Sequence, residues 1–73
     1  MRRVTVTWTD PYRLPDAWVD PGDLEDVELF IVESRGYLVR KTRDLVVIAG
    51  AVGRDGQLSN VDVIPVGCVI RIR

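Results

Sequence analysis

Short runs of β-branched and aliphatic residues, separated by turn-forming residues, fill most of this 73-residue sequence. Near the start, Val4, Val6 and Trp8 alternate with threonines, and this period of two is typical of a strand with one buried face. No stretch has the period of a long helix, so the sequence predicts an all-β fold. Further strands are predicted over residues 27–34, 37–42, 45–52, 57–64 and 68–73.

The predicted strands are joined by short connections. Ser34-Arg35-Gly36, Arg43-Asp44 and Asp55-Gly56 are typical of tight turns, and Pro65-Val66-Gly67 predicts a single helical turn before the last strand. Five or six short strands joined in this way are, at this length, typical of a small SH3-like or Sm-like barrel. We expect residues 1–73 to form one such domain. An OB-type barrel is the alternative, but it usually needs more residues and a helix, for which the sequence has no room.

Residues 10–26 interrupt the strand pattern, and we expect them to form a long acidic loop after the first strand. This Pro- and Asp-rich segment has six acidic residues and one arginine, a net charge of −5. A short helical turn is predicted at Asp20-Pro21, with Asp20 as the N-cap. Within Val27 to Ser34, the residues Leu29, Phe30, Ile31 and Val32 are apolar on both faces, which predicts a strand buried on two sides. Trp18, in the middle of the loop, is expected to be buried in its own subunit or at an interface, because an indole exposed to water is unfavourable.

The composition excludes several kinds of site. The chain has no histidine and one cysteine, Cys68, which rules out an internal disulfide, the usual zinc sites and the common nucleophile–histidine pairs. We expect Cys68 to be a buried thiol. The acidic residues of 10–26 lack EF-hand spacing, and the glycines at 50, 53 and 56 are not followed by the Gly-Lys-Ser/Thr of a phosphate-binding loop. The sequence therefore predicts no metal, no cofactor and no enzymatic activity, and it leaves packing or self-association to stabilise a thin core.

Location is inferred from the same features. The longest apolar run, Leu45 to Val52, is far shorter than a membrane span, and no signal peptide is visible. A free thiol without a signal favours the cytoplasm. A net charge of −1 gives no general attraction to a membrane or to nucleic acid.

The basic residues lie mostly outside the acidic loop, where the net charge is +4. They could simply be solvated strand ends. Alternatively, they line a pocket for an anionic, planar ligand, because arginine binds phosphate through two donors and aromatic rings stack on bases. An identical subunit could complete such a pocket. On a regular strand, Tyr37 and Lys41 would share one face and Arg40 would lie on the other. The candidate ligand-binding residues are Trp18, Tyr37, Arg40, Lys41, Arg43 and Arg54.

Four parts of the sequence carry a resemblance to a known group of proteins. They are Val4-x-Val6-x-Trp8-x-Asp10, the lone Trp18, Gly36-Tyr37-Leu38-Val39 and Ile64-Pro65-x-Gly67-x-Val69. In these parts the chain resembles short bacteriophage-encoded small β-barrel proteins. The resemblance implies an oligomeric sponge, which sequesters a nucleotide signal of antiviral defence in the cytoplasm of the bacterial host. These motifs are structural, so no ligand contact carries over residue by residue.

Two other functions stay open at this point. An Sm-like nucleic-acid-binding module would use the same arginines, although the net charge of −1 and the few aromatic residues argue against broad RNA affinity. A protein-interaction module would act through Trp18 and the acidic loop, which could mimic DNA or occupy a basic groove of a host protein.

Overall fold

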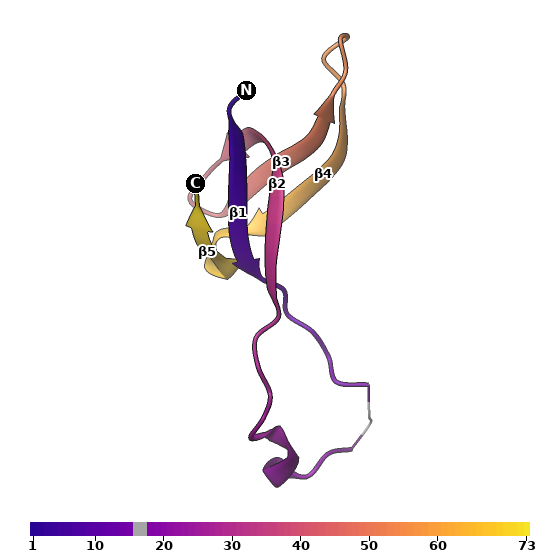
Figure 1. Cartoon of the computed structure of the whole chain (residues 1–73), viewed down its shortest axis with the longest axis vertical. Coiled ribbons are helices and arrows are strands. Elements are labelled where there is room, and N and C mark those ends of the chain that lie inside the picture. Colours follow the sequence, from indigo (N-terminus) through magenta and orange to yellow (C-terminus); the bar gives the residue numbers. More distant parts are fainter. Residues whose placement is uncertain (16–17) are drawn as a thin grey trace.

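The computed structural model describes residues 1–15 and 18–73, and it contains one sheet of five antiparallel strands (Figure 1). The all-β prediction is confirmed. The strand order is β4-β3-β2-β1-β5, so β4 and β5 are the two edges and the sheet does not close on itself within the described part of the chain. The strands are β1 (Arg3–Thr9), β2 (Ile31–Lys41), β3 (Leu45–Val52), β4 (Leu58–Pro65) and β5 (Val69–Ile72).

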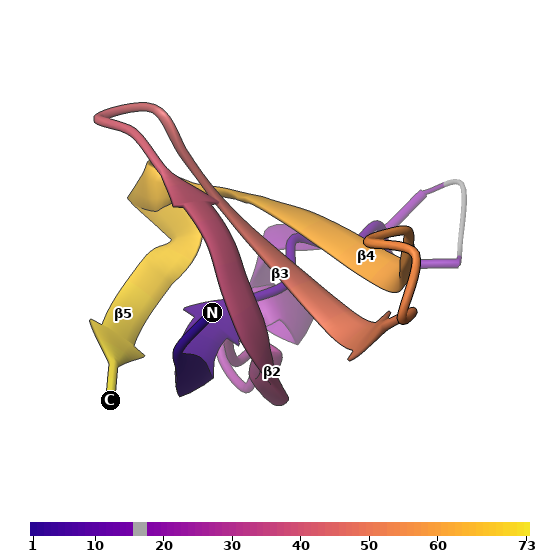
Figure 2. The same ribbon diagram turned by 90° about the horizontal axis from the view of Figure 1, so that it is seen from above.

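Strand β2 is continuous where the sequence predicted two strands and a turn, so the five-strand alternative is the correct one. Its first half pairs with β1 and its second half with β3, so β2 runs across the whole curved sheet (Figure 2). Gly36, assigned to the turn, lies within β2 instead. A Cβ atom there would be 2.6 Å from the carbonyl oxygen of Ala49, so the missing side chain lets β3 cross close to β2.

The core is thin, as the chain length predicts. Its buried side chains are Val4, Val6, Val46, Ile48 and Ile64. Half-buried residues pack around this cluster, and they are Trp8, Leu38, Val66, Cys68, Val69 and Ile72.

Two short helical turns occur where the sequence predicts them. The first, η1 (Pro21–Leu24), begins after the N-cap Asp20 with Pro21 as its first residue. The second, η2 (Val66–Cys68), connects β4 to β5. Cys68 lies in this turn rather than on the last strand, and its free thiol is half-buried against the core, less deeply than we expected.

Residues 10–30, here called the arm, leave the end of the sheet between β1 and β2 and extend away from it (Figure 1). The molecule therefore measures 52 × 21 × 18 Å. At the base of the arm, the backbone N–H of Asp10 donates to the carbonyl of Phe30 at 2.8 Å, and the Tyr12 hydroxyl donates to the carbonyl of Glu28 at 2.6 Å. Apart from half-buried Leu14, every described residue of the arm is exposed.

Two expectations about the arm are wrong for a single subunit. Trp18 is 94% exposed, because the arm carries it away from the core, so burial within its own subunit is wrong and burial at an interface stays a prediction. The segment before Ile31 is not a strand, and Leu29 and Phe30 are 73% and 59% exposed instead of buried on both faces. Asp16 of the predicted acidic loop lies outside the described residues.

Candidate anion-binding site

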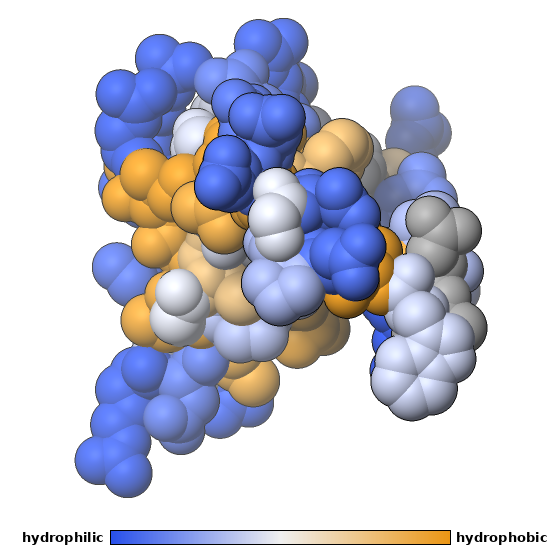
Figure 3. Space-filling view, turned by 90° about the horizontal axis from the view of Figure 1, so that it is seen from below, coloured by the Kyte–Doolittle hydropathy of each residue, from blue (hydrophilic) through white to orange (hydrophobic). Residues whose placement is uncertain are grey.

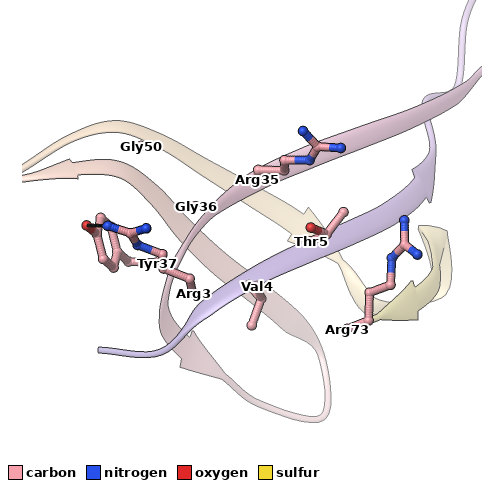
Figure 4. Close-up of a pocket in the computed structure, with 8 residues that line it drawn as sticks. All are labelled: Arg3, Val4, Thr5, Arg35, Gly36, Tyr37, Gly50 and Arg73. Atoms are coloured by element: carbon pink, nitrogen blue, oxygen red, sulfur yellow. Dashed lines mark hydrogen bonds between the residues drawn. The ribbon is translucent and has the colours of Figure 1, made fainter.

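An open groove of about 500 Å³ lies on the outer face of the sheet (Figure 4). We call it the basic groove, because three of its lining residues are arginines. It is lined by Arg3, Val4, Thr5, Arg35, Gly36, Tyr37, Gly50 and Arg73.

The pairing of three strands assembles this groove. Arg3 lies opposite Tyr37 and Thr5 lies opposite Arg35 across the β1–β2 pair. On the other side of β1, Thr5 exchanges two backbone hydrogen bonds with Arg73, at 2.7 and 2.9 Å. Residues directly opposite each other in antiparallel strands share a face. One row across β2, β1 and β5 therefore brings together arginines from distant parts of the sequence.

Arg3 and Tyr37 form one end of the groove. The Nη2 atom of Arg3 donates to the Tyr37 hydroxyl at 3.3 Å, and the guanidinium carbon lies 5.4 Å from the centre of the ring. A cation over an aromatic face at an exposed site contributes about 0.5–1 kcal/mol. The contact orients both side chains at the mouth of the groove while leaving the guanidinium charged (Figure 4).

Glu33 is the carboxylate that faces the other end of the groove. Its Oε1 atom accepts a hydrogen bond from Arg73 Nη2 at 3.3 Å, and its Oε2 atom lies 4.0 Å from Arg35 Nη2. The Arg35 and Arg73 side chains stay 78% and 54% exposed, so these ion pairs are weak and easily exchanged. One carboxylate against three guanidinium groups leaves a positive field suited to an anion.

Of the six candidate residues from the sequence, Tyr37 is the one that lines this groove. Arg40 and Lys41 end β2, and Arg43 follows in the next turn, 3.9 Å from Asp44. Arg54 lies in the β3–β4 turn, and Trp18 lies on the arm. The candidates are thus spread over the ends of the molecule instead of forming one pocket.

The prediction of which side chains share a face of β2 is wrong for Tyr37, Arg40 and Lys41. The β2–β3 pairing shifts register between Leu38 and Arg40, and such a bulge inverts the alternation of side chains. Tyr37 and Arg40 therefore share the outer face, whereas Lys41 lies opposite the buried Val46 on the core side.

The sequence analysis did not select Arg3, Arg35 and Arg73. Arg35 was assigned to a turn, whereas it lies in the middle of β2. Arg3 begins β1 and Arg73 directly follows β5, and the alternation along these two strands could have placed both side chains on the polar face. That these two strands are neighbours depends on the strand order, which alternation does not encode.

No protein-family model matches the chain, and comparison with curated proteins and with solved structures gave no significant match. Among residues 1–15 and 18–73, no group of three or more metal-ligating side chains is placed to hold a metal. Within the same residues, no helix is long and apolar enough to cross a membrane.

Proposed function

We propose that this protein is a non-enzymatic binding protein whose basic groove holds an anionic, nucleotide-type ligand. The observation that carries this proposal is the convergence of Arg3, Arg35 and Arg73 beside Tyr37 on one open face. Guanidinium groups bind phosphate through paired donors, and tyrosine and guanidinium planes stack on bases. The volume of about 500 Å³ lies within the range of about 300–1,000 Å³ typical of small-molecule sites.

The strand order supports a more specific fold. A first strand between β2 and β5, and a one-turn helix before the last strand, suit an SH3-like or Sm-like barrel that is open on one side. Together with the sequence resemblance, this favours a bacteriophage protein that sequesters a nucleotide immune signal in the cytoplasm of its host. Self-association belongs to the same proposal, because a thin core without a disulfide or a metal gains stability from a partner subunit.

Calorimetric titration tests the ligand. The panel contains cyclic di- and trinucleotides, ADP-ribose and inorganic phosphate, and we expect at least one nucleotide to bind. Arg35→Ala and Arg73→Ala should each weaken that binding about tenfold or more, since each removes a charge-assisted contact. Arg54→Ala is the matched control, because Arg54 lies in an exposed turn outside the groove and its loss should leave affinity unchanged.

The same titration separates the alternatives. If no nucleotide binds the wild-type protein, the sponge proposal is rejected. Binding that Arg54→Ala weakens as much as Arg73→Ala would place the site elsewhere. An Sm-like nucleic-acid module predicts binding of single-stranded oligonucleotides that is tighter than that of any mononucleotide and falls steeply with salt.

A further inference from the structure

The arm carries an unusual share of the exposed apolar surface. Among the described residues, seven of its large apolar side chains are exposed (Figure 3 views the molecule from the arm end). They include Trp18 and Leu29, at 94% and 73% exposed. Large apolar side chains grouped on a projecting segment are typical of an interaction surface and not of a solvated loop. The full set is Tyr12, Trp18, Val19, Leu24, Val27, Leu29 and Phe30.

Charge indicates what covers this surface. The arm has seven acidic residues and one arginine, so its net charge is −6, and the rest of the chain carries +5. Two arms packed against each other would place like charges together, which is unfavourable. The body of a second copy has the opposite charge and attracts the arm.

The body offers an apolar surface for the arm. On β4, Val61 and Val63 are 45% and 62% exposed, and they lie opposite Ala49 and Val47 of β3. We call Val47, Val61 and Val63 the apolar face, and the buried Ala49 lies beneath it. Asp62 alternates with Val61 and Val63 and therefore points to the other side of the sheet.

The edge of the apolar face is basic. Arg40 lies opposite Val47, so it shares the outer face of the sheet with these valines. An apolar surface with a basic edge and no acidic residue of β4 on the same side complements a segment that is both apolar and acidic.

We propose that the arm of one copy docks on the apolar face of a second copy. The contact is head-to-tail, because each copy contributes a different surface. It repeats from copy to copy until the copies close into a ring, or it continues as an open chain. It uses neither Arg35 nor Arg73 and does not depend on a ligand in the basic groove.

Sedimentation velocity of the full chain, with and without variants, tests the docking. Trp18→Ser with Leu29→Ser removes apolar side chains from the arm, and Val63→Glu places a carboxylate on the apolar face. Each should raise the dissociation constant about tenfold or more, the effect of losing about 1.4 kcal/mol of contact. All the substituted side chains are exposed, so circular dichroism should show an intact fold.

A matched variant identifies the charge of the occupant. Val63→Lys has a similar size to Val63→Glu and the opposite charge. An acidic arm predicts that Val63→Lys associates more tightly than Val63→Glu, and that added salt narrows the difference. Equal loss in the two variants would reject the arm as occupant.

Mixing the variants tests the head-to-tail geometry. The arm variant keeps an intact apolar face, and Val63→Glu keeps an intact arm. At a concentration where the wild type associates and neither variant does, the mixture should form a one-to-one heterodimer that grows no further. A mixture that stays monomeric would overturn the proposal. So would a wild-type chain that is monomeric at about 100 μM, because even an interface with a micromolar dissociation constant would be populated at that concentration. Arg73→Ala should associate like the wild type, because Arg73 lies outside the docking surfaces. A failure of the ligand-binding proposal can therefore be distinguished from a failure of the docking proposal.

Discussion

Gly36 on β2 faces the backbone of Ala49 on β3 so closely that a Cβ atom on Gly36 would lie 2.6 Å from the Ala49 carbonyl oxygen. This close approach allows one continuous strand to pair with β1 and then with β3. Gly36→Ala should therefore force the two strands apart and lower the free energy of unfolding by about 1–3 kcal/mol. Urea denaturation at low protein concentration measures the change.

Gly22 provides the control for that substitution. A Cβ atom at Gly22 would meet no atom within 4 Å, so Gly22→Ala should change the free energy of unfolding by less than about 0.5 kcal/mol. Equal destabilisation by both substitutions would contradict the close approach as the cause.

Thr7 has a buried hydroxyl without a hydrogen-bond partner among the described residues. Thr7→Val replaces this hydroxyl with a methyl group of similar shape and should raise the free energy of unfolding by about 1 kcal/mol. Thr42→Val is the contrasting variant, because the Thr42 hydroxyl accepts from the backbone N–H groups of Asp44 and Leu45, both at 3.1 Å. It should destabilise the protein by about 1 kcal/mol. The midpoint temperature of unfolding should therefore rise for Thr7→Val and fall for Thr42→Val.

Glu33 offsets part of the positive charge of the basic groove. Glu33→Gln removes the carboxylate that pairs with Arg73 and should tighten binding of an anionic ligand about twofold to fivefold, as expected for an exposed charge pair. Stability should barely change. Calorimetry at low salt measures the gain, and a weaker affinity would show that Glu33 is needed to position the arginines.

Trp18 and Trp8 should respond differently to a fluorescence quencher. Trp8 is half-buried and its indole N–H donates to the Ser34 hydroxyl at 2.9 Å, whereas Trp18 is 94% exposed. Acrylamide should quench Trp18 strongly in dilute protein and less strongly as concentration rises and the arm docks. Trp18→Ala should cost less than about 0.5 kcal/mol in the monomer. A larger cost would mean that the indole packs within its own subunit.

Local patterns were sufficient to predict much of the sheet. Alternation located β1, and apolar runs between turn-forming residues located β3 and β4. The helical turn at Pro21 follows from the fixed φ of proline behind an aspartate cap. The same patterns failed at Gly36, because a glycine suits a tight turn and a close strand crossing equally well. They also failed at Leu29 and Phe30, since exposed apolar residues and buried core residues look the same in a sequence.

The residues of the basic groove were harder to predict because they depend on which strands are neighbours. Arg35 and Arg73 lie on either side of their shared partner Thr5, so three segments that are far apart in the sequence meet there. The bulge beside Arg40 is equally invisible to alternation, and it exchanged the faces assigned to Arg40 and Lys41.

The pairing of β1 with β5 has a consequence for the timing of biosynthesis. Of the five strands of this sheet, β1 comes first in the sequence, yet its second neighbour, β5, comes last. Until Arg73 has emerged, one edge of β1 is unpaired and Val6 lacks its partner Ile72. The sheet therefore keeps an open edge at β1 until β5 has been made, and an open strand edge can pair wrongly with a neighbouring chain.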